Sequence, residues 1–62
     1  MKLIFVDMYK KDRVIATVQS DIIPISSRGA STDVILEGKK YTADNVTIDY
    51  DNNSTTIEVY DD

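Results

Sequence analysis

The side chains that could do chemistry in this 62-residue chain are carboxylates, amines and hydroxyls, because it contains neither cysteine nor histidine. Without cysteine there is no thiolate nucleophile, disulfide framework or thiolate metal site, and without histidine there is no Ser-His-Asp catalysis and no imidazole ligand. The carboxylates show no spacing that pairs a nucleophile with a base. We therefore expect a protein that is not an enzyme, with no catalytic residue, cofactor or metal site.

One acidic stretch does resemble the opening of a calcium loop, in which oxygen ligands alternate along the chain. It consists of Asp49, Asp51 and Asn53. Ser54 occupies the position that a calcium loop reserves for glycine, and Tyr60 stands where a bidentate carboxylate is required. Asp, Asn and Ser also form turns through local hydrogen bonds, so the sequence favours a hairpin turn here.

Charge is distributed unevenly along the chain. Residues 1–40 carry a net charge of +2 and residues 41–62 a net charge of −6, within an overall charge of −4. Asp49, Asp51 and Glu58 are expected on the solvent face of the last hairpin, where they form an acidic ribbon. Such a ribbon provides solubility and edge protection, and the alternative interpretation is a docking surface for a basic protein partner. The acidic balance argues against nucleic-acid binding.

The longest irregular stretch, residues 26–32, is small, polar and glycine-bearing, and we expect it to form a surface loop. Arg28 lies within it beside Gly29, but the pattern of a phosphate-binding loop is missing. Because loops carry many contact residues, Arg28 is a candidate for contact with a protein partner.

Branching at Cβ dominates the composition, with 20 Ile, Val and Thr residues among the 62. Such side chains suit a pleated surface better than a helix, so we expect an all-β chain. The expected strands are 2–9, 13–19, 33–37, 41–43, 46–50 and 55–60. Pro24 lacks an N–H group and is expected at an edge, a bend or a strand end. Five to six antiparallel strands in one domain, residues 1–62, predict a small closed barrel of the SH3-like or OB-like type.

The first hairpin has two registers that the sequence allows. The preferred register, with a three-residue loop, places three pairs on the core face: Met8–Val14, Val6–Ala16 and Ile4–Val18. A two-residue loop instead pairs Phe5 with Ala16 and Val6 with Ile15. In the preferred register Leu3, Phe5 and Ile15 lie off the core face, which makes them candidates for a protein interface or for contact with a second copy.

The last hairpin shows a regular alternation of apolar and polar residues on both sides of an Asp-Asn-Asn-Ser loop. A four-residue loop at 51–54 places three pairs on one face: Tyr50–Thr55, Ile48–Ile57 and Val46–Val59. The polar residues then lie on the opposite face, toward solvent.

Residues 21–60 resemble short proteins encoded by bacteriophages and prophages. The matching stretches are Asp21-Ile22-Ile23-Pro24, Asp33-Val34-Ile35-Leu36, Gly38-Lys39-Lys40-Tyr41 and residues 46–53. The loop at residues 26–32 is longer than the Gly-Asp turn usual in those proteins. The resemblance implies an SH3-like barrel and an origin in a mobile element, and it transfers no functional residue.

The predicted function is that of a non-enzymatic protein-binding module, and the phage resemblance favours an inhibitor of a host or defence protein. One alternative is a self-associating structural or assembly subunit, and another is an oligomer that sequesters a small ligand such as a nucleotide. A chain this short, without a disulfide or metal, gains stability by self-association, so we expect a homo-oligomer. The longest apolar run has four residues, so we expect no membrane association and a cytoplasmic location in a bacterial host.

Overall fold

The computed structural model describes residues 1–23 and 32–61, which form five strands and no helix. The strands are β1 (Lys2–Asp7), β2 (Val14–Gln19), β3 (Thr32–Leu36), β4 (Lys39–Asp49) and β5 (Ser54–Tyr60). The expectation of an all-β chain is therefore confirmed. Asp21 to Ile23 form no strand, while Pro24 and Arg28 lie outside the described residues.

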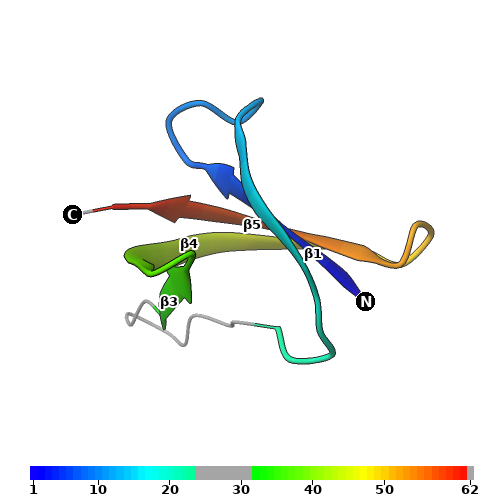
Figure 1. The fold of residues 1–62 in the computed structure, drawn as a ribbon. Coiled ribbons are helices and arrows are strands. Elements are labelled where there is room, and N and C mark those ends of the chain that lie inside the picture. Colours follow the sequence, from blue (N-terminus) through cyan, green and yellow to red (C-terminus); the bar gives the residue numbers. More distant parts are fainter. Residues whose placement is uncertain (24–31, 62) are drawn as a thin grey trace.

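The strands form a single mixed sheet in the order β2-β1-β5-β4-β3 (Figure 1). Three of the four contacts between neighbours are antiparallel, but β1 and β5 run parallel at the centre, so the expectation of a purely antiparallel sheet is wrong. The chain reaches this arrangement by crossing from β2 at one edge to β3 at the other. The sheet curls into a half-barrel, whose two edges are not paired with each other in the described part of the chain.

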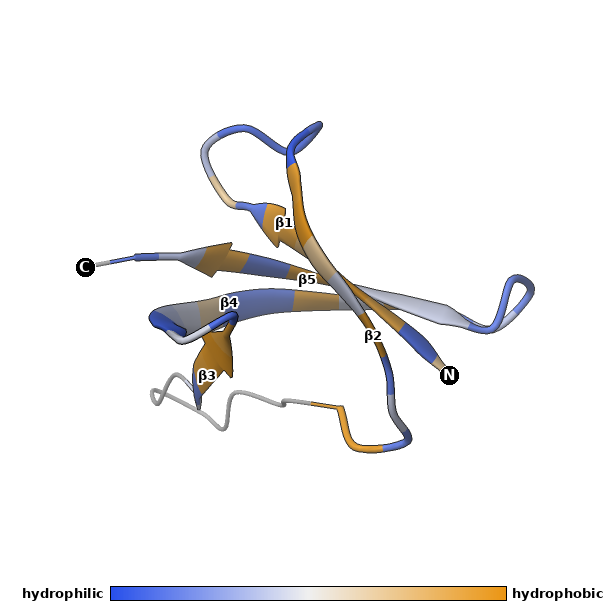
Figure 2. Ribbon diagram, viewed as in Figure 1, coloured by the Kyte–Doolittle hydropathy of each residue, from blue (hydrophilic) through white to orange (hydrophobic). Residues whose placement is uncertain are grey.

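The core lies on the concave side of this sheet and is built around β5. Thr55, Ile57 and Val59 alternate along β5 and are fully buried. Six buried residues make up the apolar core: Leu3, Phe5, Leu36, Ala43, Ile57 and Val59. Each large side chain among them stabilises the fold by roughly 1.5–3 kcal/mol through burial. Figure 2 shows the same pattern as apolar segments along β1, β5 and β3.

The first hairpin adopts the register that we did not prefer. Phe5 lies opposite Ala16, as the two-residue-loop alternative predicts, but Val6 lies opposite Val14, because the register shifts between Phe5 and Val6. Ile15 is therefore the extra residue of a β-bulge in β2. The preferred register is wrong because β1 has a second neighbour: its pairing with β5 places Phe5 beside Ile57, on the buried face.

The strand β1 also ends earlier than expected, at Asp7. The Asp7 carboxylate accepts hydrogen bonds from the backbone N–H groups of Tyr9, at 2.8 Å, and Lys10, at 3.3 Å. This local turn redirects the chain into the connecting loop and leaves Tyr9 exposed.

The last hairpin has the predicted face but the wrong pairs. Ile48 lies opposite Thr55 and Val46 opposite Ile57, so the loop occupies residues 50–53, one position earlier than predicted. This moves the pairing by two residues, which preserves the face of every side chain. Val46, Ile48, Thr55, Ile57 and Val59 share one face as expected, whereas Tyr50 lies in the loop after β4 and is 80% exposed.

The strand β4 replaces two shorter strands that the sequence suggests. Asp44 and Asn45, which separate the expected strands 41–43 and 46–50, instead lie at a register shift within one strand of eleven residues. The turn before β4 consists of Glu37 and Gly38, with φ angles of 53° and 80°, so residues 39 and 40, which lie between the expected strands 33–37 and 41–43, belong to β4. Two successive positive φ angles are typical of the type I′ turn that joins tightly paired strands.

Candidate protein-binding groove

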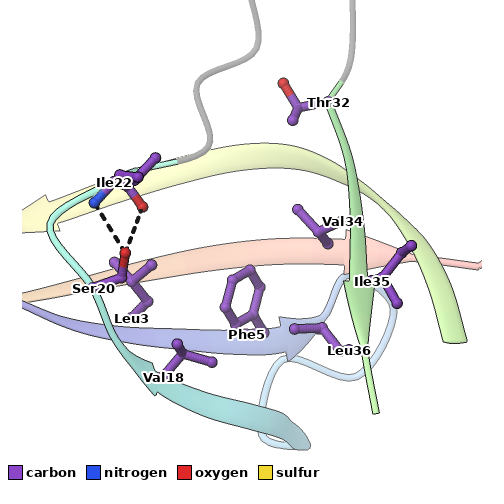
Figure 3. A pocket seen from close by; sticks show the side chains of 9 residues that line it. All are labelled: Leu3, Phe5, Val18, Ser20, Ile22, Thr32, Val34, Ile35 and Leu36. Carbon is purple, nitrogen blue, oxygen red and sulfur yellow. Dashed lines mark hydrogen bonds between the residues drawn. The ribbon is translucent and has the colours of Figure 1, made fainter. Parts of the chain in front are cut away.

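An open apolar groove of about 370 Å³ lies on the concave side of the sheet, between the β1–β2 hairpin and β3 (Figure 3). Its lining comes from three strands and the segment after β2: Leu3, Phe5, Val18, Ser20, Ile22, Thr32, Val34, Ile35 and Leu36. Seven of these nine side chains are hydrocarbon or aromatic. The groove can therefore hold apolar side chains but offers little that would activate a substrate.

Leu3 and Phe5 form the floor of the groove and are also part of the core. They are only 3% and 4% exposed, and Ile15 packs against the same cluster while partly buried. The expectation that these three residues lie off the core face is wrong, because it follows from the wrong register of the first hairpin. In Figure 3 the ring of Phe5 projects into the space between β1 and β3.

One wall of the groove is the edge strand β3. Val34 and Leu36 face the groove, whereas Ile35 projects to the other side of the strand and is 72% exposed. The two-residue turn makes Leu36 and Lys39 a hydrogen-bonded pair. Hydrogen-bonded and non-hydrogen-bonded pairs alternate along an antiparallel ladder, so Asp33 and Ile35 belong to non-hydrogen-bonded pairs. Their backbone N–H and C=O groups therefore point away from β4. The edge thus offers backbone donors and acceptors directly beside the apolar groove.

The opposite wall consists of β2 and the segment that follows it. Val18 contributes its side chain from β2. The Ser20 hydroxyl accepts a hydrogen bond from the Ile22 N–H at 3.0 Å and donates one to the Ile22 carbonyl at 3.5 Å (Figure 3). This compact turn presents Ile22 at the rim, with 81% of the residue exposed.

Two carboxylates next to the lining residues each lie beside a cation. Asp21 lies 3.4 Å from the terminal ammonium of Met1, and Asp33 lies 3.4 Å from the ammonium of Lys40. Asp21, Asp33 and Lys40 are largely exposed, and only the Met1 ammonium is mostly covered. Each ion pair therefore contributes little to stability. Both carboxylates remain available to a cationic group of a partner.

The predicted acidic ribbon is present only in part. Asp49 accepts hydrogen bonds from Asn52 Nδ2 at 2.8 Å and from the N–H groups of Asn52 and Asp51, which together lower the pKa of its carboxyl group. Glu58 lies on the same face of the hairpin, roughly 13 Å further along β5, with Lys11 3.8 Å from its carboxylate. Asp49 therefore has a structural role in the turn, and Asp51 is the most exposed member of the three.

The amines at the β3–β4 turn contact nearby acidic and aromatic groups. Lys39 lies 2.8 Å from the Asp61 carboxylate, and this hydrogen bond raises the pKa of Lys39 and lowers that of Asp61. The same ammonium lies 5.4 Å from the centre of the Tyr41 ring. Lysines of this hairpin thus pair with carboxylates of the chain itself.

Sequence reasoning identified the floor of the groove but assigned it to the wrong face, and it missed both walls. Val18, Val34 and Leu36 are ordinary strand residues whose meeting depends on which strands form the edges of the sheet. The sequence did contain one indication of the groove: the first hairpin has more apolar residues than a single buried face can hold.

Searches against family models, curated proteins and solved structures gave no match. Within residues 1–23 and 32–61 no group of three or more acidic, histidine or cysteine side chains could hold a metal ion. In the same ranges no helix is long and apolar enough to cross a bilayer.

Proposed function

We propose that this chain is a non-catalytic protein-binding module that accepts an extended segment of a partner protein along β3. The observation that carries the proposal is the juxtaposition of an apolar groove with a strand edge that has no neighbouring strand among residues 1–23 and 32–61. Backbone hydrogen bonds to Asp33 and Ile35 supply affinity, and the groove supplies specificity for apolar side chains at alternate positions.

The chemistry of the occupant follows from the faces of β3. Val34 and Leu36 face the groove, so the added strand presents apolar residues on that side. Asp33 and Ile35 lie on the other side, where a basic residue opposite Asp33 and an apolar residue opposite Ile35 are complementary. The net charge of −4 favours approach of such a basic segment from a distance.

Addition of a strand to β3 extends the five-stranded sheet at that edge. In biological terms, we propose that a phage-encoded chain binds a host or defence protein in the bacterial cytoplasm and inhibits it. Support for this role is the phage resemblance of residues 21–60 together with the small, rigid scaffold.

The test is site-specific photocrosslinking from position 35 in a bacterial lysate. The chain is immobilised with a photoreactive residue in place of Ile35, and crosslinked segments are identified by mass spectrometry. We expect one protein, crosslinked through an extended segment with alternating apolar residues and a Lys or Arg. In a separate pull-down, the immobilised chain carries no photoreactive residue. Ile35→Pro then removes an outward N–H group but no hydrogen bond to β4, and should lower capture of that protein at least about tenfold relative to the unmodified chain.

The control is Tyr50→Ser, which alters a similarly exposed side chain just after β4 and leaves the net charge unchanged. Capture should be unchanged in this variant. Capture that is equal with Ile35→Pro, or crosslinks only to a second copy of the chain, would contradict the proposal. Thermal stabilisation by nucleotides without any crosslinked protein would favour the small-ligand alternative instead.

A further inference from the structure

The other edge of the sheet, β2, differs from β3 in carrying no charge. Its sequence is Val-Ile-Ala-Thr-Val-Gln, without Asp, Glu, Lys, Arg, Gly or Pro, and four of its six residues are exposed. Val14 and Val18 are 56% and 39% exposed. Natural edge strands usually carry a charge or proline that prevents pairing with another chain, and β2 carries neither.

The backbone of β2 is regular between Ala16 and Gln19, and its outward groups can be assigned. The Ser20 N–H donates to the Met1 carbonyl at 3.0 Å, and the pairing continues without a shift to Phe5 and Ala16. Hydrogen-bonded and non-hydrogen-bonded pairs alternate in an antiparallel ladder. Thr17 and Gln19 therefore direct their N–H and C=O groups away from β1, toward the open edge.

The charges that flank β2 favour an antiparallel partner with the same sequence. The loop before β2 carries Lys10, Lys11, Asp12 and Arg13, and the residue after Ser20 is Asp21, which is almost fully exposed. Antiparallel pairing of two copies brings the basic end of each β2 beside the acidic end of the other. Parallel pairing would instead place like charges together.

We infer that two copies of this chain form a dimer through antiparallel pairing of β2 with β2, around a two-fold axis at Val18. In this register Thr17 of each copy pairs with Gln19 of the other, so reciprocal hydrogen bonds form on both sides of the axis. The bulge at Ile15 lies outside that regular segment. The inference goes beyond the proposed function because it uses the opposite edge and leaves β3 open.

The dimer closes on itself and does not extend into a fibre. Pairing β2 with its own copy consumes that edge in both chains. Continuation would require β3 to pair with β3, and the charge of Asp33 on each β3 opposes that pairing. The two edges therefore have different partners: a second copy at β2 and a basic extended segment at β3.

The first measurement is sedimentation or light scattering of the full chain at micromolar concentrations, where we expect twice the mass of 7.0 kDa. Thr17→Pro removes an outward N–H group that β1 does not use, and should raise the dimer dissociation constant at least about tenfold. Circular dichroism of the variant should keep the β signal. Its capture of a partner through β3 should also remain, which separates this inference from the proposed function.

Two further variants keep the inference testable if Thr17→Pro fails to fold. Because the chain has no cysteine, Val18→Cys introduces a single thiol, and residues facing across the axis in a non-hydrogen-bonded pair lie within disulfide range. Mild oxidation should give a covalent dimer with Val18→Cys and none with Ile35→Cys. Asp21→Arg should weaken the dimer, and Arg13→Asp combined with it should restore the affinity.

A chain that stays monomeric throughout the micromolar range overturns the inference. A dimer that survives Thr17→Pro and forms no Val18→Cys disulfide also overturns it, because the contact then lies on another surface. Covalent dimers from Ile35→Cys alone would assign self-association to β3 and contradict both proposals.

Discussion

The strands β5 and β2 have similar lengths but opposite relations between composition and burial. β5 contains one Ser, two Thr, one Glu and one Tyr, and only two aliphatic residues. Its alternate residues Thr55, Ile57 and Val59 are nevertheless fully buried. β2 contains Val14, Ile15, Ala16 and Val18, yet no residue of it is fully buried. The more apolar strand is therefore the more exposed one.

The difference arises from position in the sheet. β5 has β1 on one side and β4 on the other, so both neighbours cover its inward side chains. In the part of the chain that the structure describes, β2 has a neighbouring strand on one side only, and four of its six residues are exposed. Its exposed apolar side chains on an uncharged edge are the reason for our inference that β2 contacts a second copy.

The largest expected effect comes from Ile57→Ala, which removes the side chain at the centre of the core. Ile57 is fully buried and pairs with Phe5 and Val46 on its two sides. Loss of a buried Ile side chain costs about 2–5 kcal/mol, which is most of the stability of a domain this small. Urea unfolding followed by circular dichroism measures the change.

The matched variant is Val14→Ala in β2, whose side chain is more than half exposed. We expect the free energy of unfolding to fall by less than about 1 kcal/mol, measured at a concentration where the chain is monomeric. If the two variants lost equal stability, β2 would be as deeply embedded as β5, and the comparison between centre and edge would fail.

The last hairpin shows how far the sequence alone could go. Its alternation identified the buried face correctly, because a shift of two residues leaves faces unchanged. It could not fix the pairs, because the loop position depends on Asp49. The carboxylate of Asp49 accepts hydrogen bonds from Asp51 and Asn52 and so starts the turn one residue earlier than composition suggests.

The first hairpin marks the limit more clearly. Leu3, Phe5, Ile4 and Val6 put apolar groups on both faces of β1, so period-two alternation does not select a register. The choice is made by β5, which lies more than 45 residues away in sequence and runs parallel to β1. The groove was missed for the same reason, since its walls meet only after the order of strands is known.

An intermediate effect is expected at the turn that holds the edge strand β3. Gly38 has a φ of 80°, and a Cβ added there would meet no atom within 4 Å. Gly38→Ala should therefore cost about 1 kcal/mol through backbone conformation and not through a clash. Hydrogen exchange should show the loss concentrated in β3, because Leu36 and Lys39 are the pair next to the turn. Equal loss of protection in β5 would show that edge and centre open together, and so contradict the comparison.

The smallest effect is expected at the turn that leads into β5. Hydrogen bonds from the Asn52 side chain, and from the N–H groups of Asn52 and Asp51, hold the pKa of Asp49 below its usual 3.8. A carboxyl group with a lowered pKa in the folded state contributes stability above the pKa of the unfolded chain, and this is lost as pH falls through the folded value. Stability should therefore decline below about pH 4, and Asp49→Asn should make that decline shallower.

The control for this prediction is Asp51→Asn, which removes a charge from the same turn but none of the acceptors of these hydrogen bonds. Thermal unfolding from pH 2 to pH 7 should show the wild-type slope for Asp51→Asn and a shallower slope for Asp49→Asn. Because Asp49 is exposed, the difference is small and will be clearest at low ionic strength. The same slope in both variants would mean that the turn is held by the backbone of β4 and β5. In that case the conformation of the β4–β5 loop would be determined by the pairing of β4 with β5, and the hydrogen bonds of Asp49 would contribute little to it.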